Sequence, residues 1–146
     1  MDRRKILEIE LAELCSAMED SSEEHNYYLD LDTGKLLLIS DYMDDEESKK
    51  LKDKIDDNFD RYELLPKVES YEGYEDMEDF ISTVSDEHLA ELLHVAVKGK
   101  GAFRRFKDVL EWYPEERERW FQFRDDKLKQ RALEWLVNIG VSLLQE

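Results

Sequence analysis

Residues 27–40, YYLDLDTGKLLLIS, have the pattern of a β-hairpin. Side chains alternate along the first half with the period of two that a strand requires, and Asp32–Lys35 supply turn residues including a glycine. A second strand is predicted at Leu36–Ser40, where the continuous apolar run is typical of a central strand covered on both faces. Arg61–Leu65 predict a third strand, which Pro66 would end because proline cannot donate to a ladder. We therefore expect a small antiparallel sheet of about three strands.

The rest of the chain has helical spacing of its apolar residues. Arg3–Met18 show one apolar stripe, and a short helix is expected to bury Leu51, Ile55 and Phe59. A helix is also predicted from the i, i+3, i+4, i+7 spacing of Met77, Phe80, Ile81 and Val84. Ser85 is placed to cap a further helix, whose apolar side is Leu89, Leu92, Leu93 and Ala96. Two more helices are expected, the first with Phe103, Phe106, Leu110 and Tyr113 on its buried face and the second starting at Pro114. Apolar positions continue to Ile139, and whether Arg124–Asp126 break this second helix stays open.

We therefore predict an α+β fold: an N-terminal helix, an antiparallel sheet of about three strands, and a mostly helical C-terminal half. At 146 residues the chain is expected to form a single domain, 1–146, with a helix-and-sheet part (1–70) and a helical part (71–146).

Charge is distributed unevenly. The formal net charge is −17, but residues 1–97 hold 29 acidic and 10 basic side chains, whereas residues 98–146 hold 9 and 11. Because potential acts locally at ordinary salt, these two parts of the surface can attract different partners. The single cysteine, Cys15, excludes an intramolecular disulfide and a zinc site built on several thiolates. No signal peptide or membrane-spanning run is evident, which favours a cytoplasmic protein.

The stretch KGKGAFRRFKDVL concentrates positive charge before a predicted helix. Its basic residues are the candidates for an anion-binding or nucleic-acid-binding site: Lys98, Lys100, Arg104, Arg105 and Lys107. The spacing matches no known phosphate-binding loop. The favoured interpretation is structural, with Gly99 and Gly101 allowing a sharp turn between helices and the arginines pairing with the abundant carboxylates.

Three other groups carry weaker signals. Basic residues of 117–131 are interleaved with aromatics, but nearby carboxylates nearly cancel their charge. His88, Glu91 and His94 do not converge on a helical wheel, so no metal site is predicted. An acidic surface for a partner is predicted at Asp41, Asp44, Asp45, Glu46 and Glu47. No catalytic residues and no cofactor are predicted, because no nucleophile, base and orienting group follow a recognisable order.

Three segments together resemble the bacterial uncharacterised protein family number 158: LDLDTGKLLLIS (Leu29–Ser40), GYEDMEDFISTV (Gly73–Val84) and the run Gly99–Leu136. The resemblance covers most of the chain and implies a bacterial or phage-borne intracellular protein. It implies no activity, cofactor or catalytic residue, because the family carries none that is agreed.

The function that we expect is that of a non-enzymatic acidic binding protein acting through protein partners, in a regulatory or accessory role. A sharper version is that its carboxylates imitate nucleic-acid phosphates and occupy a basic, nucleic-acid-binding partner. The first alternative is a nucleic-acid-binding module using the 98–107 stretch, and a metal-dependent or hydrolytic enzyme ranks last. The identity of the partner and the oligomeric state stay open.

Overall fold

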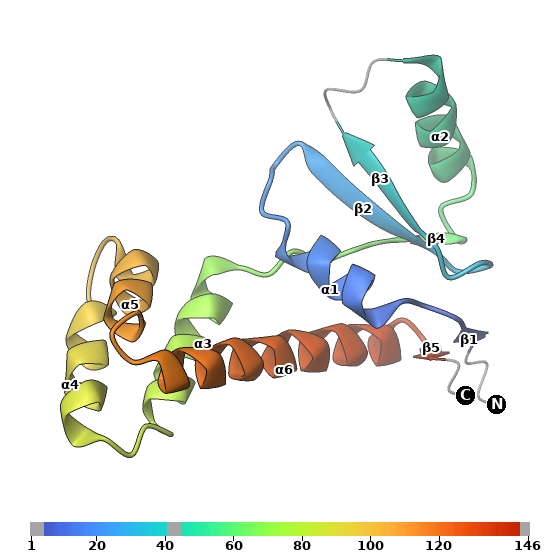
Figure 1. Ribbon diagram of the computed structural model, residues 1–146. Helices are drawn as coiled ribbons and strands as arrows, with labels where there is room; N and C mark the ends of the chain where they lie inside the picture. The colour runs from blue at the N-terminus through green and yellow to red at the C-terminus, as the bar shows by residue number, and fades with distance from the viewer. Residues whose placement is uncertain (1–4, 41–44, 144–146) are drawn as a thin grey trace. The chain divides into compact units, whose positions relative to one another are not determined.

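The computed structural model describes residues 5–40 and 45–143 of the chain. Figure 1 shows the order of the elements, which is β1 (Lys5–Leu7), α1 (Leu11–Glu19), β2 (His25–Asp30), β3 (Leu36–Ser40), α2 (Glu46–Asp57), β4 (Tyr62–Leu64), α3 (Ser70–Ile81), α4 (Glu87–Ala96), α5 (Ala102–Leu110), α6 (Pro114–Asn138) and β5 (Val141–Leu143). The α+β class, the three-stranded antiparallel sheet and the mostly helical C-terminal half are confirmed.

The chain divides into two compact units. Unit 1 combines Met1–Val68 with Lys129–Glu146, and unit 2 is Glu69–Leu128. The boundary near residue 69 agrees with the change from sheet to helices in the sequence, but the C-terminal part of α6 belongs to unit 1. That the two units act as a single domain stays a prediction.

The three-stranded sheet of unit 1 has the order β3-β2-β4. The prediction that Leu36–Ser40 form the central strand is therefore wrong, because β4 pairs with the other side of β2, placing Tyr28 opposite Leu64. The apolar run of β3 has a different cause. Ile39 packs in a cluster with Ile55 of α2 and Tyr62 of β4. Helix α2 thus covers apolar side chains of an edge strand.

The N-terminal segment is not helical from its start. The prediction of a helix over Arg3–Met18 fails at Lys5–Leu7, which form a strand paired in parallel with Val141–Leu143. This partner satisfies backbone groups that a helix would otherwise satisfy internally, and it lies too far along the sequence for periodicity to reveal it. Helix α1 keeps the expected apolar stripe, with Leu14 and Met18 buried.

The core of unit 2 is aromatic. Phe80 of α3, Phe106 of α5 and Trp120 of α6 meet edge to face, with ring centroids 4.8–6.2 Å apart. Such contacts add about 0.5–1.5 kcal/mol per pair beyond the burial of area. The predicted cap Ser85 is wrong by one residue: Asp86 caps α4 by accepting hydrogen bonds from two backbone N–H groups of its first turn. Helix α6 runs without a break through Arg124–Asp126.

Two aromatics expected in the core are at the surface. Phe59 lies beyond the end of α2 and is 74% exposed. Phe103 is 47% exposed. Its ring still lies against α3, so close to Gly73 that an added Cβ there would lie 3.0 Å from the ring. Among the helices within the described ranges, none is long and apolar enough to cross a membrane.

Candidate binding surfaces

The basic stretch 98–107 forms the turn between α4 and α5. Arg105 turns back toward the end of α4: its Nε donates to the Ala96 carbonyl oxygen at 3.0 Å, and its other guanidinium nitrogens donate to the carbonyls of Lys98 and Lys100. Gly99 and Gly101 both have φ +77, the left-handed backbone that closes a tight turn without side-chain strain. Arg105 is thus a structural clamp on the end of α4.

The remaining cations of this stretch are at the surface. Their side chains are exposed, and none of them is seen to make a side-chain hydrogen bond or ion pair within the described part of the chain: Lys98, Lys100, Arg104 and Lys107. Four free positive charges around one turn are available to an anion, but the arginine best placed to grip a phosphate with a bidentate contact is already occupied.

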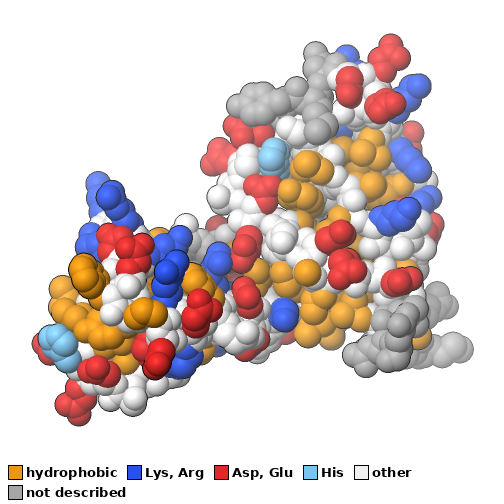
Figure 2. Space-filling model, in the orientation of Figure 1, with side chains coloured by type: hydrophobic (Ala, Val, Ile, Leu, Met, Phe, Trp, Pro, Cys, Tyr) orange, Lys and Arg blue, Asp and Glu red, His pale blue; other side chains and the backbone are white. Residues whose placement is uncertain are grey.

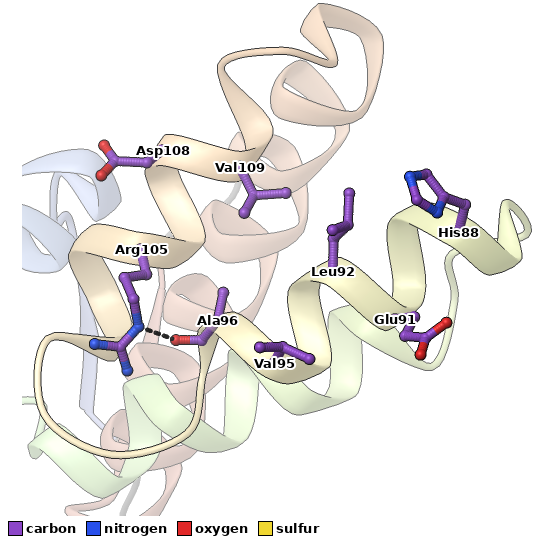
Figure 3. A pocket seen from close by; sticks show the side chains of 8 residues that line it. All are labelled: His88, Glu91, Leu92, Val95, Ala96, Arg105, Asp108 and Val109. Atoms are coloured by element: carbon purple, nitrogen blue, oxygen red, sulfur yellow. Dashed lines mark hydrogen bonds between the residues drawn. The ribbon is translucent and has the colours of Figure 1, made fainter.

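An open groove of about 600 Å³ lies between α4 and α5. Figure 3 shows its lining, which is His88, Glu91, Leu92, Val95, Ala96, Arg105, Asp108 and Val109. The residues from α4 recur at spacings of three and four, so they share one face of that helix. The groove therefore lies beside the core: Ala96 is buried and Val109 packs against the core cluster, while the outer residues of both helix faces reach the solvent.

The floor of the groove is apolar and reaches the solvent. Leu92 and Val109 point toward the space between the helices in Figure 3. Leu92 is 37% and Val95 62% exposed, although their neighbour Leu93 is fully buried. Trp112, one turn beyond Val109, is 84% exposed. Figure 2 shows hydrophobic side chains reaching the surface over this part of unit 2. Large apolar groups gathered in this way mark interaction sites more often than scattered ones do.

The groove is lined by two carboxylates and one guanidinium. Arg105 keeps its positive charge, but its guanidinium hydrogen-bonds to three backbone carbonyls of the α4–α5 connection. Glu91 of α4 and Asp108 of α5 point away from the apolar floor in Figure 3. No hydrogen bond or ion pair of either carboxylate is seen within residues 5–40 and 45–143. The groove thus presents an apolar floor between two carboxylates that have no ion-pair or hydrogen-bond partner in the described part of the chain.

The predicted acidic surface is only partly described. Asp41 and Asp44 lie outside the described residues. Asp45 caps α2: its Oδ1 accepts from the backbone N–H of Ser48 at 2.9 Å, and hydrogen bonds from Ser48 lower the pKa of its carboxyl. Glu46 and Glu47 occupy the first turn, where carboxylates favour the helix dipole. The described part of this stretch therefore starts a helix.

The histidines of α4 do not assemble a metal site. His88 and Glu91 line the groove, whereas His94 is not part of its lining. Across the described ranges, no three or more histidine, cysteine, aspartate and glutamate side chains are grouped so that they could hold a metal ion. Among the basic residues of 117–131, Arg117 lies over the ring of Phe121 at 5.4 Å, while Trp120 is buried in the core.

One polar cluster escaped the sequence analysis. Asp20, at the end of α1, accepts from the hydroxyl of Tyr27 at 2.7 Å through Oδ2 and from the backbone N–H of Ser22 at 3.0 Å through Oδ1. His25 Nδ1 also lies 2.7 Å from Oδ2 of Asp20. These hydrogen bonds, the one with His25 first, hold the pKa of Asp20 well below its usual range, and the bond to Asp20 raises the pKa of Tyr27. Spacings of five and seven across a loop carry no periodic signal.

This cluster borders a second hollow of about 450 Å³, lined by Ala12, Glu13, Ser16, Ala17, Asp20, Tyr27 and Leu36. The groups that hydrogen-bond to the Asp20 carboxylate all come from the loop between α1 and β2 or from β2 itself. The arrangement therefore fixes the entry into the sheet, and the α4–α5 groove is the stronger candidate for binding.

Comparison with known proteins identifies the relatives of the chain. The model of the uncharacterised protein family UPF0158 matches residues 4–146. The chain belongs to this family. It is 31% identical over 128 residues to a UPF0158 protein of Pseudomonas aeruginosa, which covers 88% of this chain and 80% of the relative. It is also 32% identical over 126 residues to a UPF0158 protein of Chlamydia trachomatis, covering 86% of this chain. No solved structure matches.

The family membership confirms the resemblance but assigns no activity. The chain spans only 38% of the length of the Chlamydia trachomatis relative and 40% of that from Chlamydia pneumoniae. The match over residues 4–146 includes both units, and with them the α4–α5 groove. Function must therefore be argued from the surfaces of this UPF0158 protein.

Proposed function

We propose that this UPF0158 chain is a non-enzymatic binding protein that acts through a protein partner, in a regulatory or accessory role in the cytoplasm. The observation that carries the proposal is the α4–α5 groove, whose floor leaves Leu92 and Val95 in contact with water. Exposing such side chains on a folded surface is unfavourable, by about 25 cal/mol per Å² of apolar area, unless a partner covers them.

The strong net charge supports the same proposal. A formal charge of −17 steers encounters with a basic partner and keeps acidic proteins apart from one another. The sharper hypothesis, that carboxylates imitate nucleic-acid phosphates, stays a proposal whose discriminating observation would be competition between nucleic acid and this protein for one partner.

A nucleic-acid-binding module is the second candidate. The observation in its favour is the set of four exposed cations around the α4–α5 turn, Lys98, Lys100, Arg104 and Lys107. The engagement of Arg105 with backbone carbonyls weakens it. Binding of this kind would fall steeply with rising salt and would disappear when Arg104 and Lys107 are replaced by glutamate.

The test is affinity capture from the source bacterium with nuclease present, using three baits. These are the unchanged protein, Val95→Glu and the matched control Val137→Glu, which alters a valine of similar exposure (56%) outside the groove. We expect one defined protein on the first and third baits and its loss from the second. Equal capture by all three baits would refute the groove as the binding surface, and loss of all binding with nuclease would favour the nucleic-acid candidate.

A further inference from the structure

The α4–α5 groove has the shape and chemistry to select one kind of occupant. We infer that it receives an amphipathic helix of a partner protein, with basic residues on both sides of its apolar stripe, and that Trp112 contacts this helix at one end. The inference rests on the proposed function and specifies the partner class for the same site.

The form of the occupant follows from the walls. Two neighbouring helices joined by a tight turn create a furrow into which a third helix can place residues at i, i+3, i+4 and i+7. The lining on α4 extends from His88 to Ala96, which at 1.5 Å per residue is about 12 Å, or two turns of a bound helix. The apolar floor of Leu92, Val95 and Val109 would meet one stripe of such a helix.

The charge of the occupant follows from the edges. Glu91 and Asp108 come from different helices and have no described partner, so a bound helix would have a carboxylate on each side. Lysine or arginine beside the apolar stripe could form ion pairs with both carboxylates, whereas acidic residues there would be repelled. Arg105 offsets this preference only in part, because the lining carries two carboxylates against one guanidinium. That guanidinium is also held by the carbonyls of the α4–α5 connection.

Trp112 is placed to act as an anchor. It lies in the turn that follows the end of α5, and its backbone N–H donates to the Val109 carbonyl at 3.2 Å. This hydrogen bond holds Trp112 one turn beyond Val109, which lines the groove. Its side chain is 84% exposed. Tryptophan is enriched among the residues that dominate binding energy, and here it stands ready without any change of the core.

The first experiment uses synthetic peptides as probes. One peptide of about 15 residues carries leucines at i, i+3, i+4 and i+7 with flanking lysines. The second peptide keeps the leucines and has glutamate in place of each lysine. Neither contains tryptophan, so Trp112 reports binding through its fluorescence, with Trp112→Phe as the control for the two remaining tryptophans. We expect the basic peptide to bind at micromolar concentration and the acidic peptide at least tenfold more weakly, since each interface is small.

The second experiment reverses the charges of the site. Glu91→Lys with Asp108→Lys should weaken the basic peptide about tenfold and strengthen the acidic one. The matched control is Glu118→Lys with Asp125→Lys, two exposed carboxylates of the same unit that do not line the groove. It makes the same change in net charge and should leave the preference intact. All four positions are exposed, so folding should survive.

Each outcome decides the inference. A preference for the basic peptide that the first pair reverses, and the control pair does not, supports it. The inference is overturned if both peptides bind equally or if neither binds. It is also overturned if sedimentation shows a dimer that Val95→Glu converts to a monomer, because a second copy of the chain would then occupy the groove. If Val95→Glu still abolishes capture of the native partner while both peptides fail, the proposed function stands and only the helix assignment falls.

Discussion

Replacing Arg61 by methionine tests how unit 1 is held together. Asp30, at the end of β2, is 95% buried, and Arg61 donates to both of its carboxylate oxygens at 2.9 Å. The variant leaves that carboxylate with the backbone N–H of Asp32 and the side chain of Thr33 as donors. Two charge-assisted hydrogen bonds are lost and a buried charge stays unpaired, but about a third of Arg61 faces water. We therefore expect a loss of about 2–3 kcal/mol.

The same pair predicts a dependence on pH. The hydrogen bond from Arg61, followed by that from the Asp32 backbone, lowers the pKa of Asp30 from 3.8 to about 2 against the effect of burial. Because the pKa of Asp30 is lower in the folded than in the unfolded state, its ionised carboxylate stabilises the fold fully at pH values above the unfolded-state pKa. This contribution to the free energy of unfolding is lost as the pH falls from about 4 toward 2. In Arg61→Met the pKa of Asp30 rises, so the stability difference between the variant and the unchanged protein should shrink over this range.

Urea unfolding between pH 2 and 7 measures both effects, and amide exchange at Leu31, whose N–H donates to the Arg61 carbonyl at 2.8 Å, localises them to this corner. The control is Lys52→Met, which removes an exposed cation of unit 1 and should cost under about 0.5 kcal/mol. Equal losses for the two variants, or a difference that does not change below pH 4, would show that the ion pair is not what holds Asp30 in place.

Two further predictions concern turns. Arg105→Gln should destabilise unit 2 by about 1–2 kcal/mol because three carbonyls lose a donor, whereas Arg104→Gln should be neutral in the same urea titration; equal effects would contradict the clamp. Gly34→Ala should cost more than about 2 kcal/mol, since a Cβ would overlap the Glu8 carbonyl oxygen, while Gly99→Ala, with the same φ of +77 but open space around it, should cost about 1 kcal/mol in thermal unfolding.

The elements that sequence analysis locates correctly are those with a local signal. The hairpin turn at Asp32–Lys35, the helix start at Pro114 and the stripe from Met77 to Ile81 each follow from neighbours within about seven residues. The strand at Lys5–Leu7 could not be found in this way, because its partner Val141–Leu143 pairs with it in space but belongs to the second, C-terminal sequence segment of unit 1.

The site is less predictable than the fold. The charge of residues 98–107 predicts an anion-binding stretch, yet the sequence does not reveal that Arg105 donates its hydrogen bonds to backbone carbonyls. The apolar character of Leu92 suggested core, although only its neighbours Leu89 and Leu93 are fully buried. Which apolar residues a helix leaves exposed depends on the neighbouring helices, and spacing alone does not contain that information.

The pairing of β1 with β5 has a consequence during protein synthesis. Unit 2 is continuous in sequence, from Glu69 to Leu128, so it can complete its contacts while later residues are still being added. Unit 1 cannot, because Lys5–Leu7 wait for Val141–Leu143, and contacts between such distant residues form slowly. A chain interrupted before residue 141 would therefore combine a folded unit 2 with a β1 whose backbone N–H and C=O groups are open to strands of other proteins.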